Sequence, residues 1–428
     1  MTISPLGPST QGTVGSAALT RRILAFAGIP FLSLIAPFIF LPVLARLAGA
    51  DVWVAIALGQ SVGGFVALLA GLGYPTLAPP IVAVASVQKR RRLLATSLHV
   101  RLPVWIVASV LGMIIAASLA PEANRWEAVA MAAAMSIAGL APTWFWIGVG
   151  RALPILWTEV LPRMAATLAA TGILLAGGGA IWYPALLAVA MLAGPIVVYV
   201  RIVGSEFLCI QRKEIAEILR HHPPGVIAET AAGIYNALAV AVVTSVTQVA
   251  QAARYVSGDK AYRIGQYSVS ALGNALQGWV VEAREAAIAR RMRVVLLLHV
   301  SLGLAGFAAF GALGPWMTRT LFNPDIAIDR ATAFGFGAAM LGIALGTAFG
   351  RIGLVIIGAR QAFMVCVVVA SVVGVVGLLV GGALWGAVGA AWGLGITEVL
   401  SGITQGIVFT TRWRKRGKDW RRLVRRQG

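Results

Sequence analysis

The chain contains 428 residues, of which 59% are hydrophobic and 12% are charged, and its mean hydropathy is +0.86. Soluble proteins are about half apolar and about a quarter charged, so this composition argues strongly against a water-soluble protein. The formal net charge of +20 would suggest nucleic-acid binding in a soluble chain, but the basic residues lie between apolar segments. We therefore expect a polytopic membrane protein without a nucleic-acid partner.

Sequence motifs for metal, nucleotide and channel chemistry are absent. The two cysteines, Cys209 and Cys366, cannot form a disulfide framework, and the four histidines lack HExxH spacing. The chain contains neither a GxxxxGK loop followed by Ser or Thr nor a TVGYG filter. We expect no enzymatic activity, no metal site and no cofactor, and we expect any coupling to use H⁺ or Na⁺.

Twelve apolar segments, each about as long as a membrane-spanning helix, follow one another along the chain. Short gaps that contain charges or turn residues separate them. The sequence therefore predicts an all-α polytopic membrane protein with 12 transmembrane helices, the eighth of them short and polar. The segments are 23–47, 52–74, 102–119, 128–149, 153–175, 182–200, 226–246, 264–281, 294–313, 331–350, 363–382 and 384–409.

Basic residues segregate to alternate gaps, as the positive-inside rule requires. With the N-terminus inside, 28 of the 35 Lys and Arg residues lie in inner gaps, at inner helix ends or in the C-terminal tail. We therefore expect cytoplasmic termini and two six-helix lobes. The basic tail follows a cytoplasmic helix end, so we expect it to bind anionic lipid headgroups. The predicted parts are an N-terminal segment 1–22, a lobe 23–203, a linker 204–225, a lobe 226–411 and the tail 412–428.

An internal repeat relates the two halves and is typical of transporters. Its short matching segments lie about half a chain apart, and the two halves have the same predicted orientation. The repeat therefore predicts two lobes related by an axis along the membrane normal. The matching pairs are 45–51 with 253–259, 59–62 with 265–269, and 148–151 with 358–360.

Three acids fall inside the predicted spans, where a charge costs about 2.5–3.5 kcal/mol on insertion scales and therefore marks a cavity or an internal pair. Glu159 precedes Arg163 by four residues, so the two side chains can neutralise each other or Arg163 can face an anionic substrate. Glu398 lies near the middle of the last span and can either exchange a proton or pack as a neutral group. Glu229 is a further candidate for ion coupling.

A polar stripe runs along the eighth span and predicts a water-filled cavity. Arg263, Gln266, Ser270, Asn274 and Gln277 follow steps of three and four residues, which places them on one face of a helix. Interhelical hydrogen bonding is the alternative, but a dry interface needs fewer amides.

Two further patterns concern packing. Gly342, Gly346 and Gly350 recur every four residues and predict a close helix–helix contact. The aromatic run 144–146 lies near the predicted inner interface, where an aromatic belt is expected.

Several segments resemble the polysaccharide flippases of the Wzx type, which belong to the multidrug/oligosaccharidyl-lipid/polysaccharide exporter superfamily. FLPVLARLAG at 40–49, with QSV at 60–62 and GLGY at 71–74, resembles the opening helices of that family. PTWFWIG at 142–148, followed by Arg151 and Arg163, resembles its fourth and fifth helices. The family commonly has an aromatic–glycine pair after the first outer turn, whereas here Trp53 precedes Val54.

The resemblance implies two bundles around a central cavity and alternating access that moves an undecaprenyl-pyrophosphate-linked oligosaccharide across the bacterial cytoplasmic membrane. Its partners would include the glycan polymerase or glycosyltransferases of the same pathway. A pyrophosphate requires arginines in the cavity, and the candidates are Arg46, Arg163, Arg254 and Arg263. Three alternatives stay open: a multidrug exporter, a lipid II flippase, and a membrane-embedded glycan ligase or polymerase.

Overall fold

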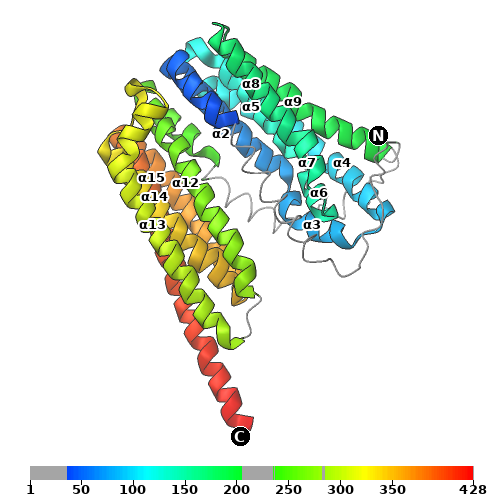
Figure 1. Ribbon diagram of the computed structural model, residues 1–428, viewed down its shortest axis with the longest axis vertical. Helices are drawn as coiled ribbons and strands as arrows, with labels where there is room; N and C mark the ends of the chain where they lie inside the picture. The colour runs from blue at the N-terminus through cyan, green and yellow to red at the C-terminus, as the bar shows by residue number, and fades with distance from the viewer. Residues whose placement is uncertain (1–35, 205–234, 236, 282–284, 428) are drawn as a thin grey trace. The chain divides into compact units, whose positions relative to one another are not determined.

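The computed structural model describes residues 36–204, 235, 237–281 and 285–427, and these residues form helices and no strand (Figure 1). The chain divides into two compact units, Met1–Thr230 and Ala231–Gly428, which we call unit 1 and unit 2. The predicted linker 204–225 lies outside the described residues, apart from Gly204. An all-α fold follows from the sequence, because helices satisfy their backbone hydrogen bonds internally within lipid.

Unit 1 contains long apolar helices interrupted by short 3₁₀ and π segments. Its elements are Ala36–Leu47, α2 Gly49–Gly71, α3 Tyr74–Val84, α4 Val87–Leu119, η1 Glu122–Asn124, α5 Arg125–Ser136, η2 Ile137–Leu140, α6 Thr143–Val149, α7 Leu153–Ile155, η3 Leu156–Val160, α8 Leu161–Leu175, α9 Trp182–Val198 and η4 Tyr199–Val203.

Unit 2 has fewer and longer elements. They are Ala237–Val246, α12 Val249–Val281, α13 Glu285–Leu321, η6 Pro324–Ile326, α14 Arg330–Gly346, η7 Thr347–Leu354 and α15 Arg360–Gln427.

Seven helical segments among the described residues are long and apolar enough to cross a membrane. The polar helix α12 is not one of them, which agrees with the polar stripe in its sequence. The count of 12 spans and the cytoplasmic termini stay predictions. The seven segments are Gly49–Gly71, Val87–Leu119, Glu122–Val149, Trp182–Val203, Ile288–Leu321, Arg330–Leu354 and Arg360–Arg414.

Helix α15 consists of two antiparallel helices joined by a tight reversal. Trp385 and Gly386 have non-helical backbone angles, and the φ of +57° and ψ of −136° at Gly386 favour glycine. A Cβ atom built on Gly377 lies 3.2 Å from the Gly393 carbonyl oxygen, so the two arms touch through glycines. The two predicted spans 363–382 and 384–409 therefore correspond to two antiparallel arms, with the reversal just after the start of the second predicted span.

One of the repeated segment pairs has the same local structure in both units. Gly150 and Gly358 both adopt a left-handed conformation, with φ of +79° and +76°. The following amides of Arg151 and Ala359 bond back to Trp146 and Leu354 carbonyls at 3.0 and 2.8 Å. Both segments thus end their helices with the same glycine-based capping motif.

Another repeated pair differs in structure. Residues 45–51 form the turn between the helix Ala36–Leu47 and α2, whereas residues 253–259 lie inside the continuous helix α12. Because α12 begins at Val249 instead of the expected position 264, Arg254 and Arg263 are helical residues and not part of an outer loop. The sequence similarity of this pair reflects composition and not a shared turn.

Exposed tryptophans mark the helix ends that we predict to be outer. Trp126 begins α5, Trp182 begins α9, Trp316 lies in the last turns of α13, and Trp385 lies at the reversal of α15. Between 52% and 72% of the surface of each is exposed. Tryptophan is enriched at membrane interfaces, so each of these residues is suited to anchor its own helix end there.

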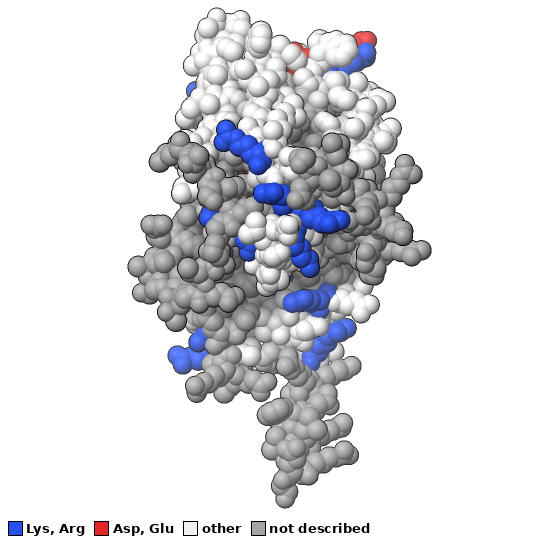
Figure 2. Space-filling model, turned by 90° about the vertical axis from the view of Figure 1, so that its right-hand side faces the viewer, with Lys and Arg blue, Asp and Glu red and all other residues white. Residues whose placement is uncertain are grey.

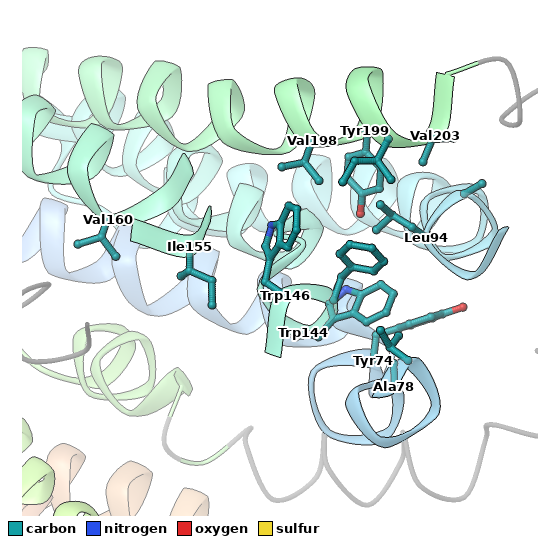
Figure 3. Close-up of a cluster of buried hydrophobic side chains, with 14 residues drawn as sticks. Tyr74, Ala78, Leu94, Trp144, Trp146, Ile155, Val160, Val198, Tyr199 and Val203 are labelled. Carbon is teal, nitrogen blue, oxygen red and sulfur yellow. The ribbon is translucent and has the colours of Figure 1, made fainter. Parts of the chain in front are cut away.

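The aromatic run 144–146 is a core element and not an interfacial belt, which corrects the sequence-based interpretation. Trp144, Phe145 and Trp146 are at most 5% exposed. Figure 3 shows Trp144 and Trp146 between side chains of α9 and η4 on one side and of α3 on the other. The short helix α3, which lies in a predicted gap, covers these rings.

Candidate functional site

Glu159 lies in the π segment η3 of unit 1. The Thr143 hydroxyl donates to its carboxylate, with distances of 2.6 Å to Oε2 and 2.8 Å to Oε1. Thr143 follows Pro142 and begins α6, so the start of one helix is tied to the π turn of another. Such π segments often occur at functional sites.

Arg163 follows one turn later, near the start of α8. Glu159 and the Tyr183 hydroxyl both lie within electrostatic range of its guanidinium. Within the described ranges, Glu159 and Arg163 form no ion pair, and the buried Nε of Arg163 has no hydrogen-bond partner. The guanidinium therefore keeps a donor that an anion can satisfy.

Arg101 is a buried charge that sequence reasoning did not recognise, because we assigned it to the basic inner gap. It is 1% exposed and lies inside α4. Its guanidinium donates to the carbonyl oxygens of Ala70, Gly139 and Ala141, the first at 3.4 Å and the last at 3.3 Å. These carbonyls lie at the ends of α2 and η2, so Arg101 joins three helices of unit 1.

The arginines of α12 in unit 2 differ in their partners. Arg263 Nε forms an ion pair with Asp259 Oδ2 at 2.7 Å, and the Asp259 side chain is 3% exposed. Arg254 is partly buried, and its Nε has no hydrogen-bond partner among the described residues. Arg254 therefore resembles Arg163 in keeping a buried donor for an anion.

The polar stripe of α12 lies on a single continuous helix, as predicted. Gln266, Ser270 and Gln277 are partly exposed, and Asn274 is exposed. The Arg351 guanidinium donates to Asn274 Oδ1 at 2.6 Å. Arg351 belongs to the π segment η7, and no sequence spacing relates it to the stripe.

Glu398 lies in the second arm of α15 against the glycine face of α14. A Cβ atom built on Gly342 lies 2.6 Å from Glu398 Cβ, which confirms the close contact predicted for Gly342, Gly346 and Gly350. Tyr235 and Tyr262 lie within electrostatic range of the carboxylate. Among the described side chains, Glu398 forms no ion pair.

Two further site residues were predicted from the sequence. Arg46 is exposed near the end of the helix Ala36–Leu47, and Glu229 lies outside the described residues. The part of the chain that the structure describes holds no group of three or more His, Cys, Asp or Glu residues suited to a metal. On the face that Figure 2 draws, basic side chains far outnumber acidic ones.

Residues 19–277 match the family model described as polysaccharide biosynthesis protein. This chain belongs to the polysaccharide biosynthesis protein family. A comparison with curated proteins finds no match.

Several solved structures have a similar fold. An inward-facing multidrug resistance MATE family transporter of the MOP superfamily has a TM-score of 0.71 at 14% identity, covering 93% of this chain and 99% of that one. The lipid II flippase MurJ in an inward closed conformation has a TM-score of 0.67 at 12% identity, covering 89% and 86%. The structure of MATE in complex with MaD3S has a TM-score of 0.58 at 15% identity, covering 94% of this chain and 96% of that one.

The family match confirms the predicted relationship to polysaccharide biosynthesis proteins, and the fold agrees with that of the exporter superfamily. At such low identity the structures establish the fold alone. The fold and the apolar helices make this family member a multi-pass membrane protein, and the solved proteins that share its fold are transporters and a flippase.

Proposed function

We propose that this protein moves an undecaprenyl-pyrophosphate-linked oligosaccharide from the inner to the outer leaflet of the bacterial cytoplasmic membrane by alternating access. The observation that carries the proposal is the match of residues 19–277 to a polysaccharide biosynthesis family in a chain with a transporter fold. A polysaccharide pathway in a membrane requires that a lipid-bound glycan change sides, and a transporter fold supplies that step.

Arginines within the helices support an anionic substrate. Arg163 in unit 1 and Arg254 in unit 2 each keep a buried Nε donor without a partner. An unsatisfied buried donor costs about 1–3 kcal/mol, and a pyrophosphate oxygen relieves that cost while forming a charge-assisted bond. The stripe from Gln266 to Gln277 offers amides and a hydroxyl to the sugars. We assign Arg46 and the ion-paired Arg263 a weaker contribution.

Ion coupling is the second part of the proposal. Glu398 is partly buried in the interior of α15 and forms no ion pair among the described residues. A carboxylate at that depth is costly unless it binds a proton or a cation, so its occupancy by H⁺ or Na⁺ can be linked to the transport cycle. Glu159, held by Thr143, is the corresponding candidate in unit 1, and Glu229 stays a sequence-based one.

The alternatives differ in what they require of the chain. A multidrug exporter of cations needs accessible carboxylates, whereas the buried Nε donors of Arg163 and Arg254 favour an anion. A glycan ligase or polymerase forms a new covalent product, and a lipid II flippase carries a different glycan on the same lipid pyrophosphate. Product analysis and a comparison of the two lipid-linked glycans separate these functions.

The test uses proteoliposomes that contain a fluorescent undecaprenyl-pyrophosphate oligosaccharide. We expect wild type to make the inner-leaflet probe accessible outside, and Arg163→Ala and Arg254→Ala to reduce the rate at least tenfold. Arg125→Ala is the matched control, because it removes an exposed arginine of unit 1. An imposed H⁺ or Na⁺ gradient should accelerate wild type but not Glu398→Gln.

Two results contradict the proposal. Folded wild type that leaves the probe in place but exports a cationic dye supports the multidrug exporter instead. A longer or transferred glycan in the lipid extract supports the ligase or polymerase.

A further inference from the structure

Arg351 is the exposed basic residue whose position calls for an explanation beyond packing. It lies within η7, a segment of eight residues in π conformation that continues α14. Gly350 and Gly353 contact Gln405 and Phe409 of α15, and a Cβ atom on Gly353 would lie 3.0 Å from the Phe409 ring. The side of η7 that carries Arg351 faces α12 instead, where the guanidinium reaches Asn274.

The partner of Arg351 does not neutralise its charge. Asn274 offers a neutral amide oxygen at 2.6 Å, and Arg351 forms no ion pair with any described carboxylate. A guanidinium has five N–H donors, so this single bond to Nη2 leaves donors directed to the exposed side. The Asn274 amide nitrogen is likewise available beside it.

The surroundings strengthen the positive field at this end of unit 2. An apolar cluster that includes Val280, Met292, Ile352, Ala359 and Phe409 packs the ends of α12, α13, η7 and α15 together. The exposed basic side chains next to these cluster residues along the chain are Arg290, Arg293, Arg351, Arg360 and Arg412.

Carboxylates are distant from this end among the described side chains of unit 2. Asp259 precedes Asn274 by 15 residues on the same helix, which corresponds to about 22 Å. Glu398 lies 11 residues before Phe409, which is about 16 Å along α15. A phosphate at this end therefore meets no described carboxylate that repels it.

We propose that Arg351 and Asn274 form a binding site for the phosphate headgroup of a lipid, at the end of the polar stripe of α12. The site rests on the proposed function and adds to it, because a lipid-linked pyrophosphate entering here meets Arg351 first and the amides and Arg263 of α12 next. Arg351 donates two N–H groups to phosphate oxygens, as arginine forks do, and Asn274 orients the fork.

The experiment measures lipid binding to the full-length protein by native mass spectrometry. Undecaprenyl pyrophosphate and phosphatidylglycerol are added in separate arms, which distinguishes the two sources of a phosphate headgroup. The variants are Arg351→Met and Asn274→Asp. Arg319→Met is the matched control, because Arg319 lies in the last turn of α13, whereas Met292 of the apolar cluster lies near the start of that helix. Asn274→Asp keeps the size of the side chain but places a carboxylate beside the guanidinium.

We expect both variants to weaken undecaprenyl pyrophosphate binding at least tenfold, and Arg319→Met to weaken it less than twofold. Arg351→Lys should retain part of the affinity, because it keeps the charge but loses the fork. A tenfold loss confined to the phosphatidylglycerol arm supports the same phosphate site with a phospholipid as its occupant. The inference is overturned if Arg351→Met and Asn274→Asp bind each of the two lipids as tightly as Arg319→Met does.

The same data separate this inference from the proposed function. If wild type and Arg351→Met bind undecaprenyl pyrophosphate equally well, only the new site is refuted. Wild type that binds no undecaprenyl pyrophosphate contradicts the flippase function. A melting temperature of Asn274→Asp close to that of wild type excludes misfolding as the cause of lost binding.

Discussion

Replacing Arg101 by methionine tests whether one buried guanidinium holds unit 1 together. Methionine fills a similar volume but cannot donate to the carbonyls of Ala70, Gly139 and Ala141. A hydrogen bond to a charged group contributes about 1.5–3 kcal/mol, and two of these bonds are long, so we take about 1.5 kcal/mol for each. The three together give about 4.5 kcal/mol.

The variant also recovers part of the cost of burying a charge, although it leaves three carbonyls at helix ends without a donor. Because the charge itself is removed, part of the loss of about 4.5 kcal/mol is recovered, and we expect a net loss of about 4 kcal/mol. At about 2–4 °C per kcal/mol for a unit of this size, the melting temperature should fall by about 10 °C.

The assay is thermal unfolding of the purified protein in detergent, followed by tryptophan fluorescence. The Arg101 guanidinium lies 5.7 Å from the Tyr74 ring, which packs against the buried Trp144, so tryptophan emission responds to unfolding around the arginine. Lys89→Met is the matched control, because Lys89 is an exposed basic residue of the same helix. Equal melting temperatures of Arg101→Met and Lys89→Met would refute the role of Arg101 as the joint of α2, α4 and η2.

Two glycines give further tests of the packing in unit 2. Gly342→Ala should lower stability by about 1–3 kcal/mol, because its methyl group meets Glu398 on the facing helix. Gly64→Ala has open space and serves as its control in the same melting assay. Gly386→Ala should cost about 1–3 kcal/mol through its backbone conformation. Gly172→Ala is the control for that variant, and a protease-resistance profile equal to the control's would contradict the strained reversal.

The sequence alone predicted the helical class, the boundaries of several helices and the family. The predicted boundary between 382 and 384 lies close to the observed reversal at Trp385 and Gly386, in a glycine-rich stretch of the apolar run. The stripe of α12 follows from a spacing of three and four residues, which any α-helix converts into a face. Local patterns were sufficient for these features, because helix geometry relates residues that are close in the chain.

Patterns that depend on partners distant in the chain were not predictable. Helix α12 begins at Val249, about four turns before the predicted position 264. The prediction began too late because charged residues such as Arg254 and Asp259 are typical of a loop between membrane spans. The ion pair of Asp259 with Arg263 lowers the cost of keeping these charges on a helix. In the same way, helix α3 covers the run 144–146. The sequence prediction placed α3 in a gap between spans, because the helix contains Pro79 and Pro80.

Hydropathy and helical periodicity depend only on neighbours along the chain, so they were sufficient to predict a helical membrane protein, and short segments that resemble known flippases indicated the family. Which charged side chains have partners depends instead on the tertiary structure. Arg101 lies 38 residues from its Gly139 acceptor and Asn274 lies 77 residues from Arg351. No periodicity connects residues at such separations, because their contacts arise from the packing of helices against one another.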